Sequence, residues 1–167
     1  SAKATLTVTA GGGGTERVTN GGFENGTTGW HGSTGVIGSF ADQPAYEGTR
    51  YAWLGGNGFF AIETLTQSVT IPSNATSAML SFALHIDTDE TKPTVYDRLT
   101  VTVRSSTGSV LRTLATWSNL DAADGYQIRS YDLSAFKGRT VTLAFVMRED
   151  NGKQTSFVLD KVSLITQ

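Results

Sequence analysis

Residues 141–147 read VTLAFVM, and the alternation of their side chains decides the fold. Valine, leucine, phenylalanine and methionine occupy the odd positions, whereas the even positions hold threonine, alanine and valine. Successive side chains of a β-strand point to opposite faces, so this run predicts a strand with one buried face. The same period of two recurs at residues 80–86 and 99–103. We therefore expect three strands whose apolar faces share one core.

Further strand-like segments recur along the chain with turn residues between them, a spacing typical of an all-β sandwich. Only residues 132–138 indicate a single helical turn, which Gly138 would end. The predicted strands are 17–24, 34–40, 50–54, 60–71, 77–87, 97–105, 108–116, 126–133, 139–149 and 154–165.

Turn signals suggest which strands are neighbours. Asn151-Gly152 is a strong two-residue hairpin signal, so we expect residues 141–149 and 154–160 to pair antiparallel. Residues 105–108 indicate another hairpin, and Asp124-Gly125 indicates a tight turn.

The composition excludes several classes of protein. The 167 residues suit one domain, and the net charge of −2 leaves no basic surplus for nucleic acid. No apolar run approaches the roughly 18 residues of a membrane span, so we expect no membrane insertion. The absence of cysteine excludes thiol catalysis and disulfides. No nucleophile elbow, zinc-protease or P-loop string is present, and we expect no enzymatic activity.

Two longer strings carry a family resemblance. NGGFENGTTGW at residues 20–30 and FVLDKVSL at residues 157–164 resemble the opening and closing strands of jelly-roll carbohydrate-binding modules. With YAWLGG and LSFALHIDT between them, they resemble the jelly-roll module at the C-terminal end of secreted bacterial peptidases and other hydrolases. The resemblance implies an antiparallel jelly-roll β-sandwich that is secreted and non-catalytic. It also implies that the module serves a larger extracellular protein by binding polysaccharide or another surface polymer.

The N-terminal residues indicate a domain boundary. ATLTVT at residues 4–9, followed by Gly11 to Gly14, is similar to the last strand of a bacterial immunoglobulin-like repeat and a linker. We expect residues 1–15 to be the tail of such a neighbouring domain and residues 16–167 to be the jelly-roll module. The alternative is that residues 4–9 form an edge strand of this module.

Related jelly rolls commonly use calcium to tie the first strand to the last. The matching residues here are Glu24, Glu47 and Asp160, and Ca²⁺ prefers such carboxylate oxygens. The apolar alternation slips by one residue at Asp160-Lys161, which predicts a bulge that redirects the carboxylate. The alternative to a calcium site is that these three acids are solvated surface residues. The acidic run at residues 87–90 is interpreted as a solvated loop.

If the three period-two strands lie side by side, their polar residues share one sheet face. Planar polar groups and an aromatic ring there suit a sugar, whose ring offers both hydroxyls and an apolar patch. The alternative is a solvated sheet with cross-strand ion pairs. The predicted ligand-binding residues are Trp53, His85, Asp87, Arg98, Arg148 and Asp150.

A structural spacer without sugar affinity is the rival function. A binding module needs exposed aromatic side chains, whereas a spacer would bury Trp53, Trp117 and Tyr126. The accessibility of these three side chains therefore separates the two functions.

Overall fold

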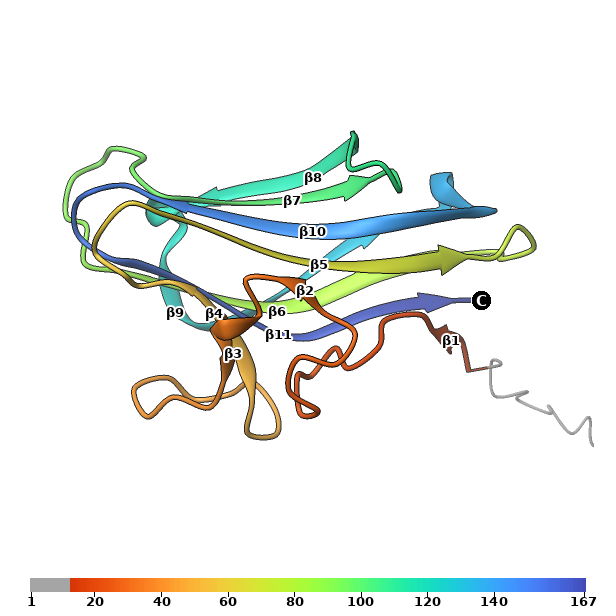
Figure 1. Cartoon of the computed structure of the whole chain (residues 1–167), viewed down its shortest axis with the longest axis horizontal. Helices are drawn as coiled ribbons and strands as arrows, with labels where there is room; N and C mark the ends of the chain where they lie inside the picture. Colours follow the sequence, from red (N-terminus) through yellow and green to blue (C-terminus); the bar gives the residue numbers. More distant parts are fainter. Residues whose placement is uncertain (1–12) are drawn as a thin grey trace, which may run out of the picture.

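The computed structural model describes residues 13–167 as two antiparallel β-sheets packed face to face (Figure 1). Sheet A has the strand order β3-β4-β11-β6-β9, with β1 paired to β11, and sheet B has the order β2-β5-β10-β7-β8. The strands are β1 (Thr15–Glu16), β2 (His31–Gly32), β3 (Ile37–Gly38), β4 (Tyr51–Gly55), β5 (Ala61–Ile71), β6 (Ala78–Thr88), β7 (Arg98–Arg104), β8 (Val110–Ser118), β9 (Ala123–Asp132), β10 (Arg139–Glu149) and β11 (Thr155–Thr166).

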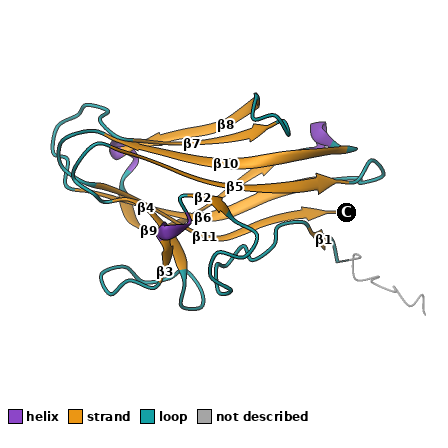
Figure 2. Cartoon of the chain, viewed as in Figure 1, coloured by secondary structure: helices purple, strands orange, loops and turns teal. Residues whose placement is uncertain are grey.

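Helix is confined to three short 3₁₀ turns, η1 (Thr34–Val36), η2 (Asn119–Asp121) and η3 (Ser134–Phe136), as Figure 2 shows. The helical turn predicted within residues 132–138 is η3, and Gly138 follows it with a φ of +77°. The all-β jelly-roll sandwich is therefore confirmed.

The core lies between the sheets and is built by the period-two runs. Leu80, Leu99, Leu143 and Phe145 are all fully buried in one continuous apolar cluster. Burial of their apolar surface is the main favourable term in folding. The prediction that the three runs share a core is confirmed.

The three runs are not neighbours in one sheet, however. β7 and β10 pair with each other in sheet B, whereas β6 lies in sheet A between β11 and β9. The apolar face of β6 therefore meets those of β7 and β10 across the core, and its polar face points the opposite way.

The hairpin predicted at Asn151-Gly152 is wrong. β10 pairs with β5 and β7, and β11 pairs with β1, β4 and β6, so the 150–154 connection crosses from sheet B to sheet A. The predicted turn at Asp124-Gly125 is instead an irregularity within β9, where the pairing register with β6 shifts. The hairpin at residues 105–108 is confirmed, since β7 and β8 pair antiparallel around it.

The predicted strands 17–24 and 34–40 are largely wrong. After β1 the chain forms turns in which Asn20 and Phe23 take positive φ values of 53° and 59°. The turns leave Phe23 fully buried, with its ring 5.1 Å from that of Trp30, which is also in the core. Residues 34–40 hold η1 and the two-residue β3.

The predicted domain boundary lies at the edge of the described residues. Thr15 and Glu16 pair with Thr166 and Ile165, which places β1 beside the end of β11. The predicted immunoglobulin-like tail and the alternative edge strand at residues 4–9 lie outside the described residues. Within residues 13–167, no helix has the length and apolar character needed to cross a membrane.

We predict that Phe145→Ala costs about 3–5 kcal/mol of unfolding free energy, because it removes a fully buried ring from the centre of the core. Phe145 lies 5.3 Å from the ring of Phe82 and 6.2 Å from that of Trp30. Val146→Ala, on the outer face of the same strand, should cost at most about 1 kcal/mol. Urea unfolding measures both variants, and equal losses would contradict the assigned faces.

Candidate functional site

Three of the predicted ligand-binding residues lie on the outer face of sheet A. Trp53 on β4 and His85 on β6 are both opposite Val158 on β11, while their neighbours in sequence, Leu54 and Ile86, point into the core. Asp87 follows two residues after His85 and shares its face.

Two others lie on the opposite side of the molecule. Arg98 on β7 and Arg148 on β10 are register partners on the outer face of sheet B. Asp150 follows β10, and its N–H donates to Asp97 Oδ1 at 2.9 Å. The prediction of one shared face is therefore wrong, because it assumed that β6 lies beside β7 and β10.

The loop of residues 39–50 covers the part of the outer face of sheet A that carries Trp53, His85 and Tyr126. Tyr51, which is buried, accepts a hydrogen bond from Phe40 N–H at 3.0 Å, and its hydroxyl lies 2.7 Å from the Gln43 carbonyl oxygen. Desolvation raises the pKa of the Tyr51 hydroxyl, so it stays a neutral donor. These bonds hold the loop against β4.

Gln43 extends this cover across the sheet. Its amide oxygen lies 3.1 Å from His85 Nδ1, and its amide nitrogen donates to the Tyr126 hydroxyl at 3.3 Å. The Tyr126 hydroxyl donates in turn to the Pro44 carbonyl oxygen at 2.9 Å, and burial raises the pKa of Tyr126 to about 12. His85 and Tyr126 are thus engaged by the loop.

Trp53 also packs against the 39–50 loop. The Phe40 ring meets it edge-on with the ring centroids 5.6 Å apart. Its indole nitrogen is buried without a hydrogen-bond partner among the described residues. At Gly56 an added Cβ would lie 2.9 Å from that nitrogen, so the 56–58 turn also closes over the ring. Trp53 is half-buried and offers no open platform.

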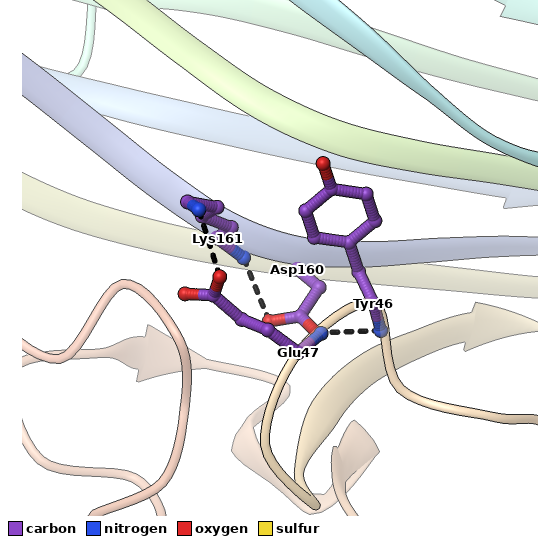
Figure 3. A network of polar contacts seen from close by, with 4 residues as sticks. All are labelled: Tyr46, Glu47, Asp160 and Lys161. Carbon is purple, nitrogen blue, oxygen red and sulfur yellow. Dashed lines mark hydrogen bonds and ion pairs between the residues drawn. The ribbon is translucent and has the colours of Figure 1, made fainter.

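Asp160 anchors the loop to the last strand, as Figure 3 shows. Its fully buried carboxylate accepts hydrogen bonds from Tyr46 N–H at 2.9 Å, Glu47 N–H at 3.1 Å and Lys161 N–H at 2.7 Å. Desolvation raises the pKa of Asp160, and the N–H donors oppose that rise. The pairing of β11 with β6 is interrupted between Asp160 and Ser163, which confirms the predicted bulge.

The other two predicted calcium residues reach the same loop. Lys161 Nζ lies 2.7 Å from Glu47 Oε2 in an exposed ion pair. Glu24 Oε1 accepts N–H groups of Thr49 and Arg50, both at 2.7 Å, and these backbone bonds lower the pKa of Glu24.

These contacts do not fit a calcium site. A calcium ion needs six to eight oxygen ligands, but the carboxylates of Asp160 and Glu24 already accept N–H groups, and Glu47 pairs with an ammonium. Over residues 13–167, no three acidic or histidine side chains are arranged to hold a metal ion. Calcium binding at Glu24, Glu47 and Asp160 is untested, and these contacts favour the alternative in which the three acids hold no metal ion.

The outer face of sheet B carries hydroxyl groups and arginines. Its outward positions alternate with the core residues of β5, β7, β8 and β10. They are Ile62, Thr64, Thr66, Ser68, Thr70, Arg98, Thr100, Thr102, Arg104, Val110, Thr113, Thr116, Ser118, Thr140, Thr142, Ala144, Val146 and Arg148, with His31 of β2 beside Thr66.

Two phenylalanines stand at one end of this face. Phe59 and Phe60 are 59% and 48% exposed, and the Arg148 guanidinium carbon lies 5.5 Å from the centroid of the Phe60 ring. An Asn151 side-chain oxygen accepts the Phe60 N–H at 2.9 Å. The Phe60 ring is therefore displayed beside Arg148 by a fixed loop.

Buried carboxylates hold that loop in place. Glu149 is fully buried, and it accepts the N–H groups of Asn57 and Gly58, each at 3.0 Å. Asp97, equally buried, accepts the Thr155 hydroxyl at 2.5 Å. Neither residue was predicted from the sequence. Asp97 lies two residues before Leu99 and Glu149 two residues after Met147, so the period of two places both side chains on the buried face of their strands.

No model of a protein family matches the chain, and a search of the curated proteins found no match. Solved structures do match. The structure of TmCBM61 in complex with beta-1,4-galactotriose has a TM-score of 0.66 and 16% identity over 92% of this chain and 99% of that chain. The Family 16 Carbohydrate Binding Module-2 has a TM-score of 0.54 and 20% identity over 88% and 97% of the two chains.

An enzyme shares the architecture as well. The Stig cyclase Fisc from Fischerella sp. TAU matches with a TM-score of 0.55 and 14% identity, over 92% of this chain and 98% of that chain. At such identities the similarity shows the fold, and one fold hosts unrelated functions. The chain therefore has the jelly-roll fold found in carbohydrate-binding modules.

We predict that a chelator leaves the melting temperature of the wild-type protein unchanged, because N–H groups and Lys161 already satisfy the three carboxylates. Asp160→Ala should cost about 1–3 kcal/mol, since it leaves the N–H groups of Tyr46 and Glu47 without their acceptor. Thermal unfolding with EDTA, and with added CaCl₂, measures both effects. A chelator-induced fall that Asp160→Ala abolishes would instead establish the calcium site.

Proposed function

We propose that the chain is a non-catalytic module that binds an extracellular polysaccharide, or another surface polymer, through the outer face of sheet B. It would serve a larger secreted hydrolase, a peptidase by the sequence resemblance, beside neighbouring domains of the same protein. The secreted context and the parent enzyme come from that resemblance.

The proposal rests on a difference between the outer faces of the two sheets. The 39–50 loop packs on Trp53 and engages His85 and Tyr126 on sheet A. Sheet B instead presents hydroxyl and guanidinium groups beside the exposed ring of Phe60. Sugar recognition needs hydrogen-bonding groups together with an aromatic surface, and sheet B offers both on a rigid scaffold.

The fold neighbours support a sugar ligand. One neighbour is named for its complex with beta-1,4-galactotriose and another as a carbohydrate-binding module. These names describe those proteins, and they raise the expectation of a sugar ligand for this chain by analogy.

The placement of the carboxylates supports a non-catalytic role. Glycoside hydrolysis needs two carboxyl groups flanking the bond that is cleaved. Asp97 and Glu149 are buried and accept hydrogen bonds from the protein, and no acid stands among the outward strand residues of sheet B. Asp87 points outward on sheet A whereas Asp150 follows β10 of sheet B, so these two carboxyl groups do not flank a common site.

A structural spacer remains the second candidate function, because the side chains of Trp53, Trp117 and Tyr126 are not openly exposed. Trp117 is buried in the core, and Trp53 and Tyr126 are half-buried. Phe59 and Phe60 favour binding instead, because at 59% and 48% they are more exposed than Phe40 and Tyr46 of the 39–50 loop, at 38% and 41%.

We predict that soluble polysaccharides retard the wild-type protein in affinity electrophoresis, and that Phe60→Ala weakens binding about tenfold by removing the apolar platform. Ile128→Ala is the matched control, because Ile128 is a 52% exposed apolar residue on the outer face of sheet A. The dissociation constant should lie between about 10 μM and about 1 mM, so the gels need high polymer concentrations.

The panel should include plant, fungal and bacterial polymers. If none retards the wild type, the spacer function replaces the binding function. If Ile128→Ala weakens binding and Phe60→Ala does not, the ligand binds sheet A and the assigned face is wrong.

A further inference from the structure

We infer that the polysaccharide bound by the outer face of sheet B is anionic and carries carboxylate groups on its sugar rings. The inference rests on the proposed function and names the ligand class of that face.

An unneutralised pair of arginines is the first observation. Arg98 and Arg148 stand directly opposite each other on adjacent antiparallel strands, and both are exposed. Like charges in this position destabilise a sheet. Within residues 13–167 the one ion pair is Lys161 with Glu47, so neither arginine has a carboxylate within 4.0 Å among those residues. A bound anion would remove the repulsion.

The acids nearest in sequence do not supply a partner. Glu149 follows Arg148 and Asp97 precedes Arg98, but both side chains point into the sandwich and are fully buried. Their oxygens accept hydrogen bonds from groups such as Gly58 N–H and the Thr155 hydroxyl. The strands therefore bury their carboxylates and expose their guanidinium groups.

A third arginine extends the positive charge along β7. Arg104 lies six residues beyond Arg98 on β7, a distance of about 20 Å along the strand, and faces the same way. The outward strand residues of sheet B include these three arginines and no acid, although the chain as a whole has a net charge of −2. A long polymer with repeated negative charges matches this layout.

The chemistry favours a carboxylated sugar. A guanidinium group presents parallel N–H donors that match the two oxygens of a carboxylate. The Phe60 ring lies against the Arg148 guanidinium group and restricts its orientation. Hydroxyls stand beside the pair, with Thr100 Oγ1 and Thr116 Oγ1 3.3 Å apart in the next row. These groups suit the neutral hydroxyls of the same ring.

The test compares two forms of one polymer, polygalacturonate and its fully methyl-esterified derivative, by calorimetry in buffer with EDTA. We expect the wild type to bind the acidic form about tenfold more tightly, and the preference to fade from about 20 to about 200 mM NaCl. Replacing both Arg98→Gln and Arg148→Gln should abolish the preference. Arg50→Gln, an exposed arginine before β4 on the sheet A side, should retain it.

The outcomes separate this inference from the proposed function. Equal affinity for the two forms, or a preference that survives the double substitution, overturns the anionic ligand and leaves polysaccharide binding standing. Dextran sulfate and duplex DNA are the further probes. If either binds as tightly as polygalacturonate, the face attracts any polyanion and the carboxylated sugar is wrong. If no polysaccharide binds, both proposals fail.

Discussion

The buried carboxylate of Asp160 is the contact on which the arrangement of the two faces depends. It sits at a bulge in β11, where the chain turns through Lys161 with a φ of +50°. Its oxygens accept hydrogen bonds from two N–H groups of the 39–50 loop. Without Asp160 these N–H groups would lack their acceptor. Because the loop is tied there and at Tyr51, it covers Trp53 and His85 on the outer face of sheet A. The Arg98 and Arg148 side chains on the outer face of sheet B stay exposed.

The buried acids of and beside the strands of sheet B, Glu149 and Asp97, act in the same way. Glu149 and Asp97 point inward and hold the connections around Asn57 and Asp150. This arrangement keeps Phe60 beside Arg148. A carboxylate buried with several N–H donors is costly to disturb, so it fixes loop geometry. Fixed geometry is what a weak polymer-binding surface needs, since ordering a mobile loop would reduce its affinity.

Local sequence patterns predicted the strands and failed for their partners. The period of two placed Leu143 and Phe145 inside and Arg148 outside, because these positions depend only on the pleat of one strand. One neighbour of β10 is β5, whose paired residues lie 68 to 88 positions earlier, and no local signal encodes that pairing. Asn151-Gly152 marks a turn, but it does not say whether the chain returns in its own sheet or crosses to the other.

The candidate site shows the same division. His85 and Arg148 both point outward as predicted, yet they lie on opposite sides, since their strands belong to different sheets. The bulge at Asp160 was readable because it breaks an apolar alternation. The cover over Trp53 was not, because the 39–50 loop carries no periodic pattern and its contacts with β4, β6, β9 and β11 are all tertiary.

The most direct test of this account is an amide NMR titration with a short oligosaccharide of whichever polymer the wild type binds best. We expect shift changes to concentrate in β5, β7 and β10 and in residues 56–60, with the loop at 39–50 unaffected. Shift changes centred instead on β4, β6 and the 39–50 loop would show that the ligand opens the cover of sheet A, and would contradict the assignment of sheet B as the binding face.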